Sequence, residues 1–203
     1  MNACNLTDYE LVNQFIQGNH AALEQLISRH RSRVYTYIYL MVKDHHLTED
    51  LFQDTFLKVI KSLLDGKYQD NGKFLSWVVR IAHNLIIDHF RKKKQMNMLI
   101  NEDYENDLFN SSKISAYNAE DTIVHRQISK DLRNLVEELP ADQKEVVILR
   151  HFVGLSFKEI ADFTNVSINT ALGRMRYALI NLRKLSKNEI FACQSEVFFF
   201  MMQ

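Results

Sequence analysis

Residues that favour turns are scarce in this chain: 203 residues include only five glycines and one proline. Folds built from short strands and tight turns depend on both residue types. Leu, Ile, Lys, Glu and Asn are frequent instead, and hydrophobic residues make up 46% of the chain, enough to fill packed cores. The composition therefore predicts an all-α fold of long helices.

Capping signals and apolar periodicity place the expected helices. Thr7 and Glu10 have the spacing of a capping box, and Asn19 and Thr48 are further candidate N-caps. In the first half of the chain we expect helices from Thr7 to Gly18, Asn19 to about Met41, Thr48 to about Leu64, and Phe74 to about Lys94. Residues 95–118 lose the periodicity and are rich in Asn, Ser, Asp and Glu, which predicts a flexible linker.

A second set of helices is expected after the linker. Gly154 has the position of a C-terminal cap, Ser156 and Glu159 form a second capping box, and Asn165 lies in a tight turn. The expected helices are Asp121–Glu138, Ala141 to about Phe152, Ser156 to about Phe163, and Ile168 to about Lys187. We therefore expect two helical domains, residues 1–95 and 120–187, joined by a linker at 96–119 and followed by an apolar tail at 188–203.

The formal net charge is zero, but the charges are unevenly distributed. Residues 80–94 contain five Lys and Arg against one acid, and residues 168–187 contain five against none. The acidic residues concentrate between these segments, from residue 102 to 145. This pattern predicts two separate sites for nucleic acid, with a middle segment that repels phosphate.

The segment from Leu155 to Lys187 has the pattern of a helix-turn-helix: a short capped helix, a three-residue turn and a longer basic helix. Ala161 is small where the two helices must approach each other, and Asn tolerates the left-handed conformation that the turn requires. The residues expected on or near the exposed face of the second helix are Asn169, Thr170, Gly173, Arg174 and Arg176. Side chains there reach base edges in the major groove. The alternative is a plain helical hairpin with a solvated, charged face.

The helix that begins at Phe74 carries a polar stripe at Arg80, Asn84, Asp88 and Arg91, flanked by His83 and ending in four consecutive basic residues. The stripe can bind nucleic acid, or it can be the solvated face of an amphipathic helix. Phe74 and Trp77 are expected in the core rather than stacked on bases.

Together these segments resemble the extracytoplasmic-function (ECF) sigma factors of the sigma-70 family, and specifically the Bacteroidetes branch. Residues 47–59 resemble the helix that binds core RNA polymerase, and residues 74–91 resemble the helix that binds the promoter −10 element. Leu139-Pro140, residues 146–150 and the helix-turn-helix resemble the −35 domain. The resemblance covers residues 8–95, which would be sigma region 2, and 120–187, which would be sigma region 4. The chain departs from it at Asn165, where the family usually has Gly, and at Leu172 and Gly173, where many members have Lys and Ser.

The resemblance implies roles for individual residues. The side chains implied to bind the clamp helices of the largest polymerase subunit are Asp50, Gln53, Asp54, Phe56 and Leu57. The loop Tyr68–Lys73 would hold a flipped-out −10 base, and the implied −10 residues are Tyr68, Asn71, Lys73, Arg80, His83, Asn84, Asp88, Arg91 and Lys92. The implied −35 residues are Ser167, Asn169, Thr170, Gly173, Arg174, Arg176, Arg183 and Lys184.

The partners implied by the resemblance are core RNA polymerase, through its clamp helices and flap, promoter DNA, and an anti-sigma factor. We expect no cofactor, metal or small-molecule ligand, because Cys4 and Cys193 form no metal-binding pattern and no nucleotide loop or catalytic set is recognisable. The chain is expected to be a cytoplasmic protein that is not an enzyme and has no signal peptide or membrane span. The alternative function is a one-component helix-turn-helix transcriptional regulator, in which residues 1–95 bind a ligand or form a dimer.

Overall fold

The computed structural model describes residues 6–69, 72–100 and 135–188, and all regular structure among them is helical. The chain divides into two compact units, residues 1–112 and 113–203, in agreement with the two expected helical domains. Within the described ranges, no helix is both long and apolar enough to cross a bilayer. The same ranges contain no cluster of three His, Cys, Asp or Glu side chains that could hold a metal ion.

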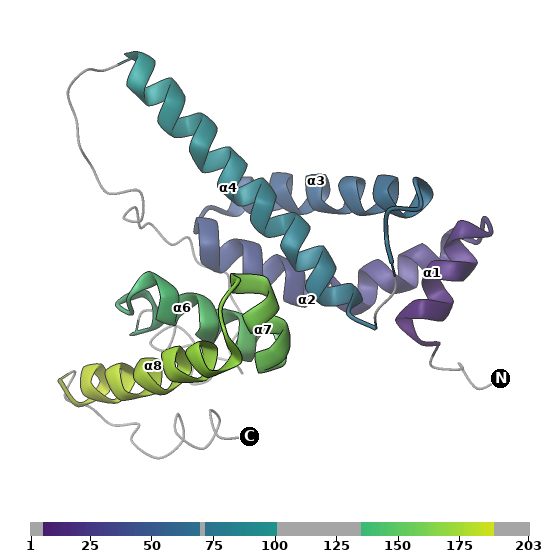
Figure 1. Ribbon diagram of the computed structural model, residues 1–203. Helices are drawn as coiled ribbons and strands as arrows, with labels where there is room; N and C mark the ends of the chain where they lie inside the picture. Colours follow the sequence, from purple (N-terminus) through teal and green to yellow (C-terminus); the bar gives the residue numbers. More distant parts are fainter. Residues whose placement is uncertain (1–5, 70–71, 101–134, 189–203) are drawn as a thin grey trace, which may run out of the picture. The chain divides into compact units, whose positions relative to one another are not determined.

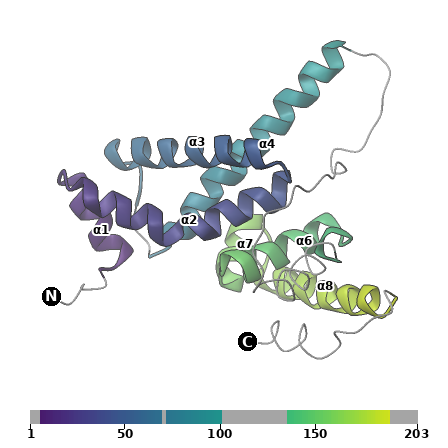
Figure 2. The same ribbon diagram turned by 180° about the vertical axis from the view of Figure 1, so that it is seen from behind.

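Among its described residues the first unit has four helices, α1 (Asp8–Ile16), α2 (His20–Val42), α3 (His45–Leu64) and α4 (Phe74–Ile100). Helix α2 contacts the other three, and α4 crosses both α2 and α3 (Figures 1 and 2). Fully or almost fully buried side chains from all four helices form the core: Leu11, Leu26, Val34, Tyr37, Ile38, Val59, Leu63, Phe74, Val78, Val79, Ala82 and Ile86. This core determines which side of α3 and α4 remains exposed.

The N-terminal caps of α1 and α2 confirm the sequence prediction, whereas that of α3 corrects it. Thr7 and Glu10 form the capping box, and the Asn19 side chain accepts a hydrogen bond from the Ala21 amide. Thr48 does not cap α3, because the helix begins one turn earlier with Asp44 as its N-cap. Thr48 is fully buried, and its hydroxyl donates to the Asp44 carbonyl over 2.6 Å.

Helix α4 continues to Ile100, past the expected end of the helix at Lys94 and past the expected domain boundary at residue 95. Residues 95–100 contain no Gly or Pro, and Gln, Met and Leu are good helix formers, so nothing in the local sequence ends the helix. The other residues of the expected linker lie outside the described residues.

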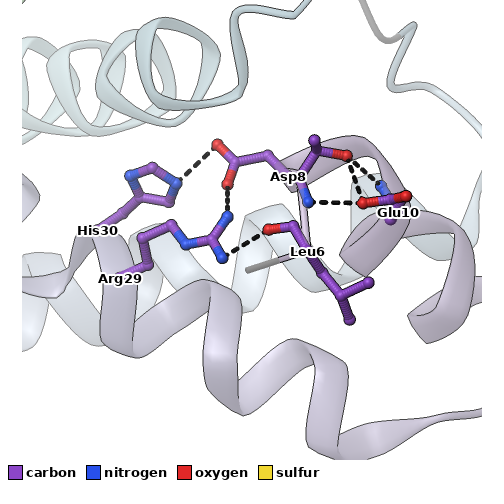
Figure 3. A network of polar contacts seen from close by, with 6 residues as sticks. Leu6, Asp8, Glu10, Arg29 and His30 are labelled. Atoms are coloured by element: carbon purple, nitrogen blue, oxygen red, sulfur yellow. Dashed lines mark hydrogen bonds and ion pairs between the residues drawn. The ribbon is translucent and has the colours of Figure 1, made fainter. Parts of the chain in front are cut away.

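A polar network fixes α1 against α2 (Figure 3). The two carboxylate oxygens of Asp8 pair with Arg29 Nη1 at 2.6 Å and with His30 Nε2 at 2.8 Å. Arg29 also donates from Nη2 to the Leu6 carbonyl at 2.7 Å. His30 is buried, and its ring lies 5.5 Å from that of Phe74 at the start of α4. The network therefore connects Leu6 and the start of α1 to α2, and the His30 ring extends it to the start of α4.

The second unit contains α6 (Ala141–Val147), a π-helical continuation η2 (Ile148–Val153), α7 (Phe157–Thr164) and α8 (Ile168–Asn188). Helix α8 contacts both α6 and α7. The second capping box and the left-handed conformation of Gly154 and Asn165 confirm the sequence prediction. Of the expected helix Asp121–Glu138 only the end is described, with residues 135–137 helical, and the tail beyond Asn188 lies outside the described residues.

Acid should weaken the fold through one buried and two half-buried histidines. Burial lowers the pKa of His30, His83 and His151 below the ordinary value of about 6.5, and for His30 this outweighs the opposing effect of Asp8. Below about pH 6.5 the unfolded chain therefore binds protons that the folded chain excludes, so the free energy of unfolding should decrease as the pH falls from 7 towards 5.

The measurement is urea unfolding at a series of pH values for the parent chain and for His30→Gln, which keeps a donor for Asp8 but does not titrate. This variant should show a shallower decrease than the parent. His46→Gln changes an exposed side chain and should leave the slope unchanged. An equal slope for His30→Gln and the parent would contradict the role of His30.

Candidate nucleic-acid interface

Four of the five residues expected to bind core polymerase share the exposed face of α3. Asp50, Gln53, Asp54 and Leu57 are all exposed, and their spacing puts them on the side opposite the buried residues. Leu57 is 64% exposed, as is Leu64 two turns later, so the face carries apolar side chains beside its two acids. The α3 face therefore offers both charged and apolar side chains to solvent.

Phe56, the fifth residue, lies on the other side of the helix. Its side chain is only 6% exposed, and its ring lies 4.8 Å from that of Phe52. The expectation that Phe56 faces a partner therefore does not agree with this structure. The helical repeat explains the difference, because a residue adjacent to Leu57 is rotated by about 100° and here turns into the core.

The loop before α4 presents an aromatic cluster. The Tyr68 ring lies 4.5 Å from Trp77 and 5.7 Å from Phe74, measured between centroids. Phe74 is buried, as expected, whereas Tyr68 and Trp77 are half-buried and keep part of their rings accessible. Lys73 is half-buried beside this cluster, and Asn71 lies outside the described residues.

The polar stripe of α4 lies on the exposed side of the helix. Arg80, Asn84, Asp88, Arg91 and Lys92 are all exposed, while the buried residues of the helix face α2 and α3. Four of these five side chains are charged and three are basic, so the exposed surface has the chemistry of a phosphate-binding face.

His83, at the edge of this stripe, is half-buried, and its Nδ1 lies 2.8 Å from the hydroxyl of the buried Tyr37. Burial, and secondarily the Arg80 guanidinium, lower the pKa of His83, so it is neutral at pH 7. His83 therefore contributes hydrogen bonds rather than positive charge to this surface.

Helices α7 and α8 form the expected helix-turn-helix. Asn165, with φ of 53°, ends α7, and the Ser167 hydroxyl accepts from the Thr170 amide at the start of α8. Ala161 is 3% exposed at the contact between the helices, as expected for a small residue there. The predicted −35 residues that the structure leaves exposed on α8 and at its cap are Ser167, Asn169, Thr170, Arg176, Arg183 and Lys184, while Gly173 is half-exposed.

Arg174 differs from the other predicted −35 residues. Its Nη2 lies 2.6 Å from the Asp142 carboxylate on α6, and its side chain is only 24% exposed. Burial raises the pKa of the Glu145 carboxyl group, which is also on α6. The positive charge of Arg174 counteracts part of this effect. Two turns further along α8, Asn181 donates to Gln143 of α6 over 2.8 Å. Arg174 therefore holds α8 against α6, a role that no local sequence pattern indicated, since its partner is 32 residues away.

Models of two protein families match the chain. The family described as Sigma-70 region 2 matches residues 26–96, which include most of α2, all of α3 and most of α4. The family described as Sigma-70, region 4 matches residues 129–177, which include α6, α7 and the first half of α8. The two matches therefore correspond to the two units.

A curated relative and two solved structures are similar to the chain. The ECF RNA polymerase sigma factor SigE of Mycolicibacterium smegmatis is 30% identical over 185 residues, which cover 88% of this chain and 68% of the relative. CnrH in complex with the cytosolic domain of CnrY has a TM-score of 0.65 at 22% identity, over 90% of this chain and 99% of that one. The sigma factor RpoE in complex with the anti-sigma factor NepR from Bartonella quintana has a TM-score of 0.62 at 21% identity, over 81% and 96%. At these identities the two structures establish similarity of fold.

The ion pair between Asp142 and Arg174 should make a small, measurable contribution to stability. Asp142 is 65% exposed, so water screens the pair, and a double-mutant cycle of Asp142→Ala and Arg174→Ala should give a coupling of about 0.5–1 kcal/mol. The cycle is measured by urea unfolding. Arg176→Ala, which removes an exposed guanidinium from the same helix, should change stability by less than about 0.5 kcal/mol. Additive single changes at Asp142 and Arg174 would contradict a stabilising pair.

Proposed function

The chain belongs to the ECF RNA polymerase sigma factors of the sigma-70 family, and we propose that it directs core polymerase to promoters that carry particular −10 and −35 elements. The observation that carries the proposal is that each of the two units exposes one helix face with the chemistry of a DNA-binding surface, on α4 and on α8. The chain contributes recognition and no catalysis of its own, because polymerase supplies the chemistry. Its place of action is then the cytoplasm, where polymerase transcribes.

The exposed face of α3 is the proposed contact with the clamp helices of the largest polymerase subunit. Asp50 and Asp54 provide charge for partner selection, and Leu57 provides an apolar side chain that gains stability when it is buried by the partner. Gln53 lies between them and can hydrogen-bond to either kind of group. Phe56 is buried on the inner side of α3, where its ring packs against that of Phe52.

The −10 element is the proposed ligand of α4 and the aromatic cluster. Removing a base from the stack costs a few kcal/mol, and aromatic side chains together with basic residues offset that cost. Tyr68 and Trp77 offer partly exposed rings, and Arg80 and Arg91 offer charge along the exposed side of α4. Asn84 lies between the two arginines, where its amide can hydrogen-bond to an unpaired base.

The −35 element is the proposed ligand of the helix-turn-helix. Asn169 and Thr170 lie in the first turn of α8, the part of a recognition helix that reaches base edges in the major groove. Arg176, Arg183 and Lys184 continue along the helix and suit contacts to phosphate. The ion pair with Asp142 holds the Arg174 side chain in place. Its guanidinium is therefore already oriented before DNA binds.

An anti-sigma factor is the proposed regulator. One solved structure with the same fold is of a sigma factor in complex with an anti-sigma factor. The recognition-helix segment 169–179 resembles the Bacteroidetes branch of the family, in which a membrane anti-sigma factor and an outer-membrane transporter often control the sigma factor. We include regulation of this kind in the proposal.

The proposal is tested by binding to purified core polymerase, followed by run-off transcription from a library of randomised promoters. We expect tight binding, and transcripts from promoters that share two elements. Leu57→Ala should weaken binding to core about tenfold, corresponding to about 1.4 kcal/mol, since an exposed apolar side chain at the centre of the α3 face is lost. Ile16→Ala, which removes a comparably exposed side chain from α1, should leave binding unchanged. Absence of binding to core, with specific duplex binding by the free chain, would instead establish a one-component regulator.

Asn84→Ala should slow promoter opening without weakening upstream docking, because Asn84 is on the unit assigned to the −10 element. Opening is followed by the fluorescence of 2-aminopurine placed in the −10 element, and docking by protection of the −35 region. On a promoter whose −10 region is already unpaired, the variant should still bind the single strand more weakly than the parent. Normal opening kinetics in the variant would remove Asn84 from the proposed site.

A further inference from the structure

The outer surface of α8 near its N-terminus is partly apolar. Ile168 is 46% exposed and Leu172, one turn later, is 44% exposed, so the two side chains lie on neighbouring positions of one helix side. Asn169 is exposed beside them, and the buried residues Ala171 and Met175 face the core of the unit. Two large apolar side chains are therefore presented to solvent on the part of the helix-turn-helix where base contacts are made.

Gly173, next to Leu172, has no packing role in this unit. A Cβ atom at this position would meet nothing within 4 Å, and the residue lies within a regular helix. Glycine within a helix costs about 1 kcal/mol of stability relative to alanine, so a larger residue at this position would stabilise α8. On the side of α8 that turns away from Leu172, Gly173 also lines an open groove of about 600 Å³ together with Thr170 and Tyr177. Because residue 173 has no side chain, another molecule can approach the backbone of α8 closely at this position.

The charges around this apolar surface indicate what approaches it. Residues 168–186 contain no acidic residue, and Arg176, Arg183 and Lys184 are exposed along the same helix. A purely apolar partner offers no anionic group to this basic surface, whereas a duplex offers phosphates. Within the major groove the apolar group is the 5-methyl of thymine, which apolar side chains contact directly. The groove is about 12 Å wide and a helix with its side chains about 10–12 Å across, so a missing side chain at residue 173 allows deeper entry.

We propose that Leu172, assisted by Ile168, reads thymine in the upstream promoter element by contact with its 5-methyl group, and that Gly173 permits the approach this contact needs. The proposal rests on the function proposed above, in which α8 enters the major groove, and it names part of the sequence that is read. Leu172 thereby becomes a specificity-determining residue for which no polar contact is required.

The test replaces each thymine of the selected upstream element in turn by deoxyuridine, which removes only the methyl group. Binding of the duplex is measured with the polymerase holoenzyme formed by the full chain. At one or two positions the parent should bind the deoxyuridine duplex about three- to fivefold more weakly, the size expected for one methyl group that is buried on binding. Leu172→Ala should bind thymine and deoxyuridine duplexes equally at those positions.

The control is Ile180→Ala, which removes an exposed apolar side chain from the same helix three turns after Ile168 and should keep the full methyl dependence. Thermal unfolding verifies that Leu172→Ala folds like the parent. Equal affinity of the parent for all thymine and deoxyuridine duplexes would overturn the proposal, as would an unchanged methyl dependence in Leu172→Ala. Failure to bind core polymerase is a separate observation and would overturn the proposed function alone, because the same duplex comparison can be made with the free chain at low salt.

Discussion

The burial of one side of a long helix is the constraint on which the exposed surface of each unit depends. In the first unit Val78, Val79, Ala82 and Ile86 are buried along α4, which fixes the opposite side of that helix towards solvent. In the second unit Ala171, Met175, Ala178 and Leu182 have the same effect on α8. Because the side chains of a helix cannot rotate independently around its axis, each apolar stripe determines which polar side chains can reach DNA.

The sequence was most informative where the determining interaction is local. Capping boxes, the left-handed turn at Asn165 and the apolar stripes all arise from residues within a few positions of each other, and the structure confirms them. Thr48 was misassigned as a cap because Asp44 and Thr48 both have capping chemistry, and only burial of Thr48 in the tertiary structure distinguishes them. The resemblance implies a partner contact for Phe56, and the structure differs because that side chain packs into the core against Phe52.

Interactions between distant residues could not be predicted from the sequence. The pairs of Asp8 with Arg29 and His30 span 21 and 22 residues, and that of Asp142 with Arg174 spans 32. Any of several acids could have been the partner of these cations on the basis of charge alone. The difference matters for the site, because Arg174 belongs both to the exposed basic helix and to the contact between α6 and α8. The roles of Asp50, Asn84 and the other predicted DNA- and polymerase-binding residues stay predictions.

A chain with no net charge that binds DNA needs its basic residues concentrated on particular faces. The faces of α4 and α8 meet this requirement separately, and each lies in a different unit. Two modest binding surfaces on one chain reinforce each other only when both can engage the same DNA molecule. Core polymerase, which binds through α3 in the proposed function, is the component that would bring the two surfaces to two elements of one promoter.

The most direct measurement is footprinting of a selected promoter by the full chain with and without core polymerase. We expect two separate protected regions in the presence of core, one upstream and one at the −10 element, with unpaired bases only in the second. The free chain should protect the promoter weakly, and this protection should decrease steeply with salt as counterions are released. Strong protection of a single continuous site by the free chain, unaffected by core polymerase, would contradict a sigma factor that needs core to engage both elements.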